Sequence, residues 1–159
     1  MVHAKRVNPP SQRYDFTEDG RPLTTFALRR GRTGARFGLH GANYVVRAHR
    51  FSGVYELHDA DGTVVATTDR VGRSWHLTCS GRVVGFRQTA AASREYAMIG
   101  DDGATAGTVR RAGHLRSELT ADLPGLELAL QVFVLVVVLH RNRRTRAAAG
   151  VRATSLAGG

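Results

Sequence analysis

Short runs in which hydrophobic and polar residues alternate make up most of the chain before residue 122. Alternation with a period of two is typical of a β-strand with one buried face. The clearest run is residues 74–79, which a two-residue Ser-Gly turn joins to residues 82–88. A turn of this length fixes the register of a hairpin. It predicts two cross-strand pairs whose side chains share one face, Trp75 with Phe86 and Leu77 with Val84.

Further runs of this kind follow one another at regular spacing, with glycine-containing turns between them. Besides the hairpin above, we expect strands at residues 14–16, 23–28, 37–39, 43–50, 54–58, 63–68, 94–99, 104–111 and 115–121. Short strands at this spacing predict an antiparallel meander, either closed as a β-barrel or folded as a sandwich. The fold class is therefore mainly β.

Two of the expected hairpins carry similar residues at the same internal spacing. The matching residues are Tyr55, Leu57, Asp61 and Gly62 in one hairpin and Tyr96, Met98, Asp102 and Gly103 in the other. The match is either a weak internal duplication or the ordinary composition of two β-hairpins. Both alternatives predict the same meander.

One stretch breaks the alternation. Residues 126–139 (LELALQVFVLVVVL) are the most hydrophobic part of the chain, and the basic run HRNRRTR follows at residues 140–146. The stretch can be a helix buried in a barrel, a transmembrane helix or a buried strand. The valines favour a strand, and the arginines that follow resemble the positive flank of a membrane helix.

Length and capping favour the buried helix. A membrane helix needs about 20 apolar residues, whereas this run is shorter and contains Glu127. Asp122 and Pro124 suit the cap and first turn of a helix. From Val132 onward every face is apolar, so a helix here must be surrounded. We therefore predict a closed antiparallel β-barrel around a central hydrophobic C-terminal helix at residues 124–141, with Glu127 and Gln131 hydrated at the barrel mouth.

The expected organisation is one domain with two short flanks. Residues 1–12 are polar and contain Asn8-Pro9-Pro10, so we expect a mobile lead-in. Residues 13–142 form the barrel and its helix. Residues 143–159 are basic and rich in Ala and Gly, and we expect a flexible tail.

Composition changes this picture mainly through charge. The formal net charge is +10, and Lys5 is the only lysine. The preference for arginine, with abundant Ala, Gly and Val, indicates a GC-rich bacterial genome. A single cysteine, Cys79, excludes an internal disulfide framework, and no apolar segment of a secretory signal precedes the strands. We expect a cytoplasmic protein, peripheral at the inner face of the cell membrane.

Arginines gather in two patches, and these are the candidate binding residues. They are Arg29, Arg30, Arg32 and Arg36 in the first patch and Arg141, Arg143, Arg144 and Arg146 in the second. Such patches attract anionic lipid at about 1 kcal/mol per residue, and they attract nucleic-acid phosphates as well. Because no aromatics for base stacking are interleaved with them, lipid is favoured over nucleic acid. A basic surface that only confers solubility is the remaining alternative.

No motif predicts catalysis, a metal site or a cofactor. The sequence has no Gly-Lys-Ser/Thr phosphate loop, no Gly-x-Ser-x-Gly elbow and no histidine pair four residues apart. The Asp-Gly turns near residues 59–62 and 100–103 lack the further ligands of an EF-hand loop. We expect a non-enzymatic protein.

Several of these motifs together resemble a known family. They are the pattern Tyr55-x-Leu57-x-x-x-Asp61-Gly62, its echo at residues 96–109, and Leu123-Pro124 with residues 128–135. They resemble the LURP-one-related group of the Tubby C-terminal-like superfamily, which includes phospholipid scramblases. The resemblance covers residues 12–142 and implies an antiparallel barrel of about twelve strands around one hydrophobic helix.

The resemblance also implies a function. It implies binding of anionic headgroups such as phosphoinositides through basic barrel residues, although no single family position is matched here. We expect a module that binds anionic membrane lipid or a protein partner through its basic surface. The alternative is a small membrane-anchored protein with residues 123–139 in the bilayer, and a nucleic-acid-binding barrel is a weaker one.

Overall fold

The computed structural model describes residues 1–8, 11–28, 34–91, 93–113 and 118–156, which form twelve strands and one helix. The strands are β1 (Val2–Val7), β2 (Arg13–Glu18), β3 (Arg21–Ala27), β4 (Gly34–Leu39), β5 (Ala42–Ala48), β6 (Tyr55–His58), β7 (Val64–Thr68), β8 (Ser74–Cys79), β9 (Arg82–Gln88), β10 (Tyr96–Ile99), β11 (Thr105–Arg111) and β12 (Leu119–Asp122). The helix is α1 (Leu128–Leu156).

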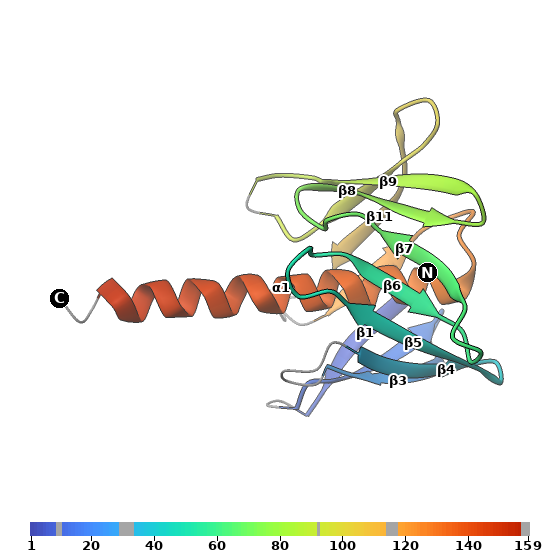
Figure 1. Cartoon of the computed structure of the whole chain (residues 1–159), viewed down its shortest axis with the longest axis horizontal. Coiled ribbons are helices and arrows are strands. Elements are labelled where there is room, and N and C mark those ends of the chain that lie inside the picture. The colour runs from blue at the N-terminus through green and yellow to red at the C-terminus, as the bar shows by residue number, and fades with distance from the viewer. Residues whose placement is uncertain (9–10, 29–33, 92, 114–117, 157–159) are drawn as a thin grey trace.

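The strands form one antiparallel sheet that curls around α1 (Figure 1). Their order is β3-β2-β1-β12-β11-β10-β9-β8-β7-β6-β5-β4, so β1 and β12 are the neighbours that are distant in sequence. Over the described residues β3 and β4 stand at the two ends of this order, which leaves the barrel nearly closed. The predicted antiparallel barrel is confirmed, with this seam as the departure from full closure, and the sandwich alternative is wrong.

The predicted hydrophobic helix fills the barrel. Each residue from Val132 to Val138 exposes 1% or less of its surface. Large inward side chains from the strands surround it, including Trp75, Tyr96, Phe16, Phe26 and Phe86. The segment is therefore a helix covered by strands rather than a strand or a helix in lipid. None of the helical residues that the structure describes forms a stretch long and apolar enough to cross a bilayer.

The hairpin register predicted from the Ser-Gly turn is confirmed. Trp75 pairs with Phe86 and Leu77 with Val84 across β8 and β9. All four side chains are buried, and the rings of Trp75 and Phe86 stack with centroids 4.4 Å apart. The pleat makes this register stable, because a slip of one residue would turn the four side chains toward solvent.

The two similar hairpins also share an irregularity. The register shifts between Leu57 and His58 in the β6–β7 pair and between Met98 and Ile99 in the β10–β11 pair. These positions correspond in the two hairpins, so the repeated residues adopt the same local geometry.

The expected lead-in is wrong. Residues 2–7 form β1, which pairs with β2 on one side and β12 on the other. Val2 and Ala4 are fully buried. Two small inward side chains in a polar segment are a weak strand signal, and it is pairing on both edges that makes the strand stable.

The helix bounds also differ from those expected. Asp122 ends β12 instead of capping the helix, and a turn closed by the Leu126 N–H to the Leu123 carbonyl follows. The helix begins at Leu128 and runs to Leu156, so residues 143–156 are helical rather than a flexible tail. Arg and Ala favour helix strongly, which accounts for the extension. Glu127 is exposed and Gln131 partly exposed at the barrel mouth, as predicted.

Candidate anion-binding site

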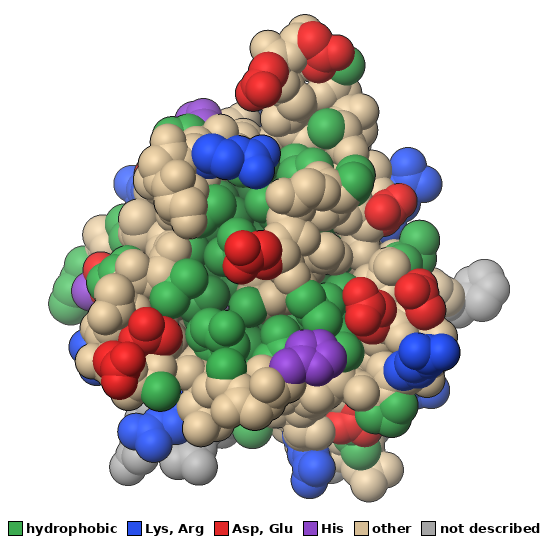
Figure 2. All heavy atoms as spheres, turned by 90° about the vertical axis from the view of Figure 1, so that its right-hand side faces the viewer, with side chains coloured by type: hydrophobic (Ala, Val, Ile, Leu, Met, Phe, Trp, Pro, Cys, Tyr) green, Lys and Arg blue, Asp and Glu red, His purple; other side chains and the backbone are tan. Residues whose placement is uncertain are grey.

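Charge is distributed unevenly along the barrel axis. Successive connections of an up-and-down barrel lie at alternate ends, and we call these the start end, where α1 begins, and the exit end, where α1 leaves the barrel (Figure 1). Figure 2 shows the start end, where acidic side chains lie among and around a group of hydrophobic side chains, with several Lys and Arg side chains on the same face. The acidic residues in the turns of this end, or in the strand position next to a turn, are Glu18, Asp19, Asp59, Asp61, Asp101, Asp102, Asp122 and Glu127.

The exit end instead gathers arginines. They come from α1 and from the strands and loops around it, and we call them the arginine collar: Arg6, Arg50, Arg70, Arg111, Arg141, Arg143, Arg144 and Arg146. The helix members of the collar follow directly on the buried part of α1, which ends at Leu139, and beyond them α1 projects from the strands (Figure 1). The collar therefore combines a concave surface with a high density of positive charge.

The first pocket of the collar has a volume of about 230 Å³. Its lining comes from α1, from the start of β6 and from the β5–β6 and β7–β8 loops: Arg50, Phe51, Gly53, Tyr55, Arg70, Val71, Arg141, Arg144 and Thr145. Four of these side chains are guanidinium groups, and no described lining residue is acidic. A guanidinium offers paired N–H donors that match phosphate or carboxylate oxygens. The pocket is thus chemically suited to an anion.

The second pocket of the collar has a volume of about 160 Å³. Its lining comes from α1, β1, β2, β11, β12 and the β1–β2 loop: Arg6, Gln12, Tyr14, Arg111, Leu119, Leu139, Asn142, Arg143 and Arg146. Again the lining holds four arginines and, over the described residues, no acid.

Three of the helix arginines make their described contacts with neutral groups. Arg144 donates to the Arg50 carbonyl at 3.1 Å, and Arg143 donates to the Leu28 carbonyl at 3.4 Å. The Arg141 guanidinium lies 5.8 Å from the centroid of the Tyr96 ring, within cation–π range. These contacts fix the side chains to the barrel rim without neutralising their charge.

Neighbouring titratable groups respond to burial and to the positive charge of the collar. The pKa of His140 is lowered from 6.5 to about 4, first by burial and then by Arg144 and Arg143. Burial raises the pKa of Tyr55 and of Tyr14, while nearby arginines oppose the rise in both. At neutral pH His140 is therefore uncharged and both tyrosines keep their protons.

Phe51 is the most exposed large hydrophobic residue that the structure describes, at 103% of its reference surface. It lies in the β5–β6 loop and lines the first pocket beside Arg50. The exposed ring is hydrophobic and the arginines around it are positively charged. This combination suits the boundary between lipid headgroups and acyl chains.

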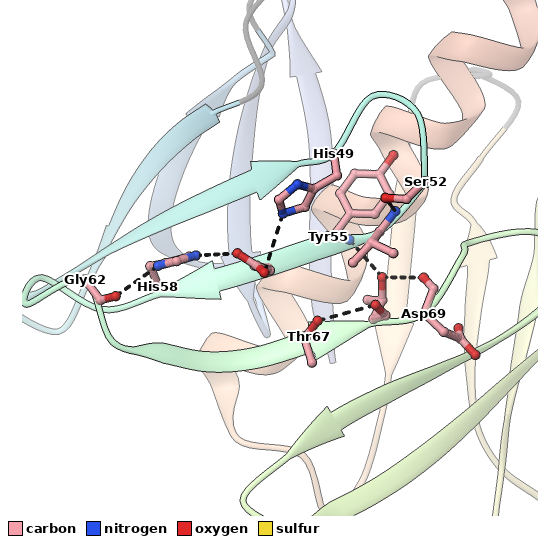
Figure 3. Close-up of polar contacts among 10 residues, drawn as sticks. His49, Ser52, Tyr55, His58, Gly62, Thr67 and Asp69 are labelled. Carbon is pink, nitrogen blue, oxygen red and sulfur yellow. Dashed lines mark hydrogen bonds and ion pairs between the residues drawn. The ribbon is translucent and has the colours of Figure 1, made fainter.

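A polar network holds the strands beneath the first pocket (Figure 3). The Tyr55 N–H donates to the Thr68 hydroxyl at 3.0 Å, and that hydroxyl donates to the Asp69 carbonyl at 2.8 Å. Glu56 lies 2.8 Å from His58 Nε2 and 3.5 Å from His49 Nε2. The hydrogen bond from His58 is the largest effect on the Glu56 carboxyl and lowers its pKa; desolvation opposes this effect, and the hydrogen bond and charge of His49 lower the pKa further. The packing of β5, β6 and β7 against one another explains these contacts.

The predicted binding residues do not all lie in the collar. Arg141, Arg143, Arg144 and Arg146 all line one of the two pockets. Arg36 is exposed on β4, paired in register with Val45, and is not among the described lining residues of either pocket. Arg29, Arg30 and Arg32 lie outside the described residues.

The sequence interpretation missed half of the collar and its aromatic residue: Arg6, Arg50, Arg70, Arg111 and Phe51. They are scattered singly along the chain, so no local charge run reveals them. One signal in the sequence could have found Arg50 and Arg70. Every second connection of a meander lies at the same end of the barrel, so arginines in such connections come together.

Within the described part of the chain, no three His, Cys, Asp or Glu side chains cluster in a way that could hold a metal ion. Comparison of the chain with protein-family models, with curated proteins and with solved structures found no match.

Proposed function

We propose that the chain is a non-enzymatic, Tubby-like and LURP-one-related binding module that attaches to anionic membrane lipid through its arginine collar. The observation that carries the proposal is the first pocket, in which Arg50, Arg70 and Arg144 surround a space next to the exposed Phe51 ring. The barrel wrapped around a hydrophobic helix supports the family assignment.

The mechanism of attachment is electrostatic attraction followed by insertion. The collar concentrates positive charge at the exit end of the barrel, so this end turns toward a negatively charged surface. Arginines then bind headgroup phosphates as bidentate donors. The Phe51 ring enters the interface, where burial of its apolar surface adds to the binding free energy.

Vesicle flotation tests the proposal. The protein should float with vesicles that contain phosphatidylserine or a phosphoinositide and stay in solution with pure phosphatidylcholine, and binding should fall as salt rises. Phe51→Ala and Arg70→Gln should each weaken binding. Val83→Ala is the matched control, because Val83 is exposed on β9 at 63% and has no place in the collar.

Two further measurements distinguish anionic lipid from other ligands. If inorganic phosphate at millimolar concentration displaces the protein from vesicles while Phe51→Ala has no effect, the ligand is a free anion and not a membrane. Tight binding to a DNA or RNA duplex without flotation would assign the collar to nucleic acid. Equal flotation with neutral vesicles overturns the electrostatic mechanism.

A further inference from the structure

The two collar pockets use different arginines of one helix. Arg141 and Arg144 line the first pocket, and Arg143 and Arg146 line the second. Residues three apart share a helix face, whereas residues two apart differ by about 200° around the axis. The sequence Arg-Asn-Arg-Arg-Thr-Arg at 141–146 therefore directs one arginine pair to each side of α1.

The body of the helix separates the two pockets. An α-helix with side chains is about 10 Å across, and the two pockets are lined by arginines on different faces of α1. One phosphate group is far smaller than this and cannot touch both arginine pairs. The rim supplies each pair with its own further arginines, Arg50 and Arg70 on one side and Arg6 and Arg111 on the other.

We propose that the collar contains two independent anion sites, one on each side of α1, and that the protein holds two phosphate-bearing groups at once. This inference rests on the proposed function for the identity of a lipid ligand, but not for the number of sites. Each site is complete in itself, with two arginines from the helix, two from the rim and a tyrosine, Tyr55 or Tyr14.

The two sites differ in what surrounds the anion. The first has the exposed Phe51 at its edge, so it suits a phosphate that is attached to a lipid. The second has Gln12 and Asn142 amides in its lining, so its surroundings are polar and suit a more hydrated anion. Occupation of both would hold α1 between two anchoring points.

A titration with inorganic pyrophosphate, followed by amide NMR of the full chain, tests the number of sites. Two groups of signals should shift, one from Phe51 and Gly53 and one from Gln12 and Tyr14. Arg70→Gln should abolish the first group only, and Arg111→Gln the second only. Both arginines are exposed, so neither change should lower the melting temperature. Arg82→Gln, at the β8–β9 turn of the start end, is the control and should leave both groups unchanged.

The same variants should act independently on vesicles. Each basic residue near an anionic membrane contributes about 1 kcal/mol to binding. Arg70→Gln and Arg111→Gln should therefore each weaken partitioning onto anionic vesicles about fivefold. Because the two sites are independent, the double variant should weaken it about 25-fold. If only one group of NMR signals shifts, or if one variant abolishes both groups, the two-site proposal is wrong even where flotation persists. If both groups shift as described and no variant floats differently from the wild type, the two sites stand and the membrane function fails.

Discussion

The Tyr55 hydroxyl lies 2.7 Å from Nδ1 of His140, and this contact joins β6 to α1 at the point where the helix leaves the barrel. The rings meet edge to face, with centroids 5.4 Å apart. At the corresponding position of the similar hairpin, Tyr96 contacts the next helix residue, Arg141. The two equivalent tyrosines thus contact consecutive residues of α1, His140 next to the collar and Arg141 within it.

Removal of the Tyr55 hydroxyl should destabilise the protein modestly. Tyr55→Phe deletes the hydrogen bond to His140 and leaves a half-buried ring nitrogen without that partner, so the free energy of unfolding should fall by about 1–2 kcal/mol. Urea denaturation measures the change. Tyr44→Phe is the control, because the structure describes a stacking contact of Tyr44 with Phe37 and no hydrogen bond of its hydroxyl. Equal losses in both variants would contradict a role for the contact.

Acid should destabilise the fold through His140. Its pKa is about 4 in the folded chain against 6.5 for an ordinary histidine, so between these values the unfolded chain binds a proton that the folded chain does not. Stability therefore rises with pH through this window and is lost as pH falls, by up to about 3 kcal/mol at pH 4.

The measurement is the free energy of unfolding at pH 7 and at pH 4.5 for the wild type and for His140→Gln. Other groups titrate in both proteins, so the difference between the two slopes isolates His140. The variant should show a shallower decline on acidification. Identical slopes would mean that His140 is charged in the folded state or does not titrate differently on unfolding.

A charge in the centre of α1 should abolish folding. Val136 exposes 1% of its surface, and an aspartate there would be a buried, unpaired charge. Val136→Asp should lose the near-ultraviolet circular dichroism signal and the cooperative melting transition. Val83→Asp makes the same chemical change at a site that is 63% exposed and should fold. A folded Val136→Asp protein would contradict the central position of the helix.

Gly107 should not tolerate a side chain. A Cβ atom there would lie 2.6 Å from the Asp122 carbonyl oxygen and 3.0 Å from Met98 Cε, so β12 or its neighbours would have to shift. Gly107→Ala should lower the free energy of unfolding by about 1–3 kcal/mol, the usual effect of overpacking. A Cβ at Gly72 meets nothing within 4 Å, so Gly72→Ala is the matched control and should melt close to the wild type.

The strands of the meander, the register of the β8–β9 hairpin and the buried helix were predictable from sequence, because each depends on local periodicity. Trp75, Leu77, Val84 and Phe86 alternate with polar residues around a two-residue turn, and this pattern admits one register. Residues 132–138 are apolar on every face, and a helix of that kind must be surrounded on all sides by apolar groups.

Other features depended on contacts between distant parts of the chain. Val2 and Ala4 carry little strand signal of their own, and β1 forms because β2 and β12 offer it two edges. The helix begins at Leu128 and not at the predicted residue 124, because Asp122 still belongs to the sheet, where it pairs with Thr108.

The sequence by itself determined the barrel, its central helix and the excess of positive charge, since periodicity and composition are properties of the chain. Only the tertiary structure decided where that charge acts. Closing the meander sends alternate connections to opposite ends, so arginines from residue 6 to residue 146 meet around one helix and acidic turns collect at the other end. The contact between Tyr55 and His140 joins residues far apart in sequence, and no local pattern encodes such a pair.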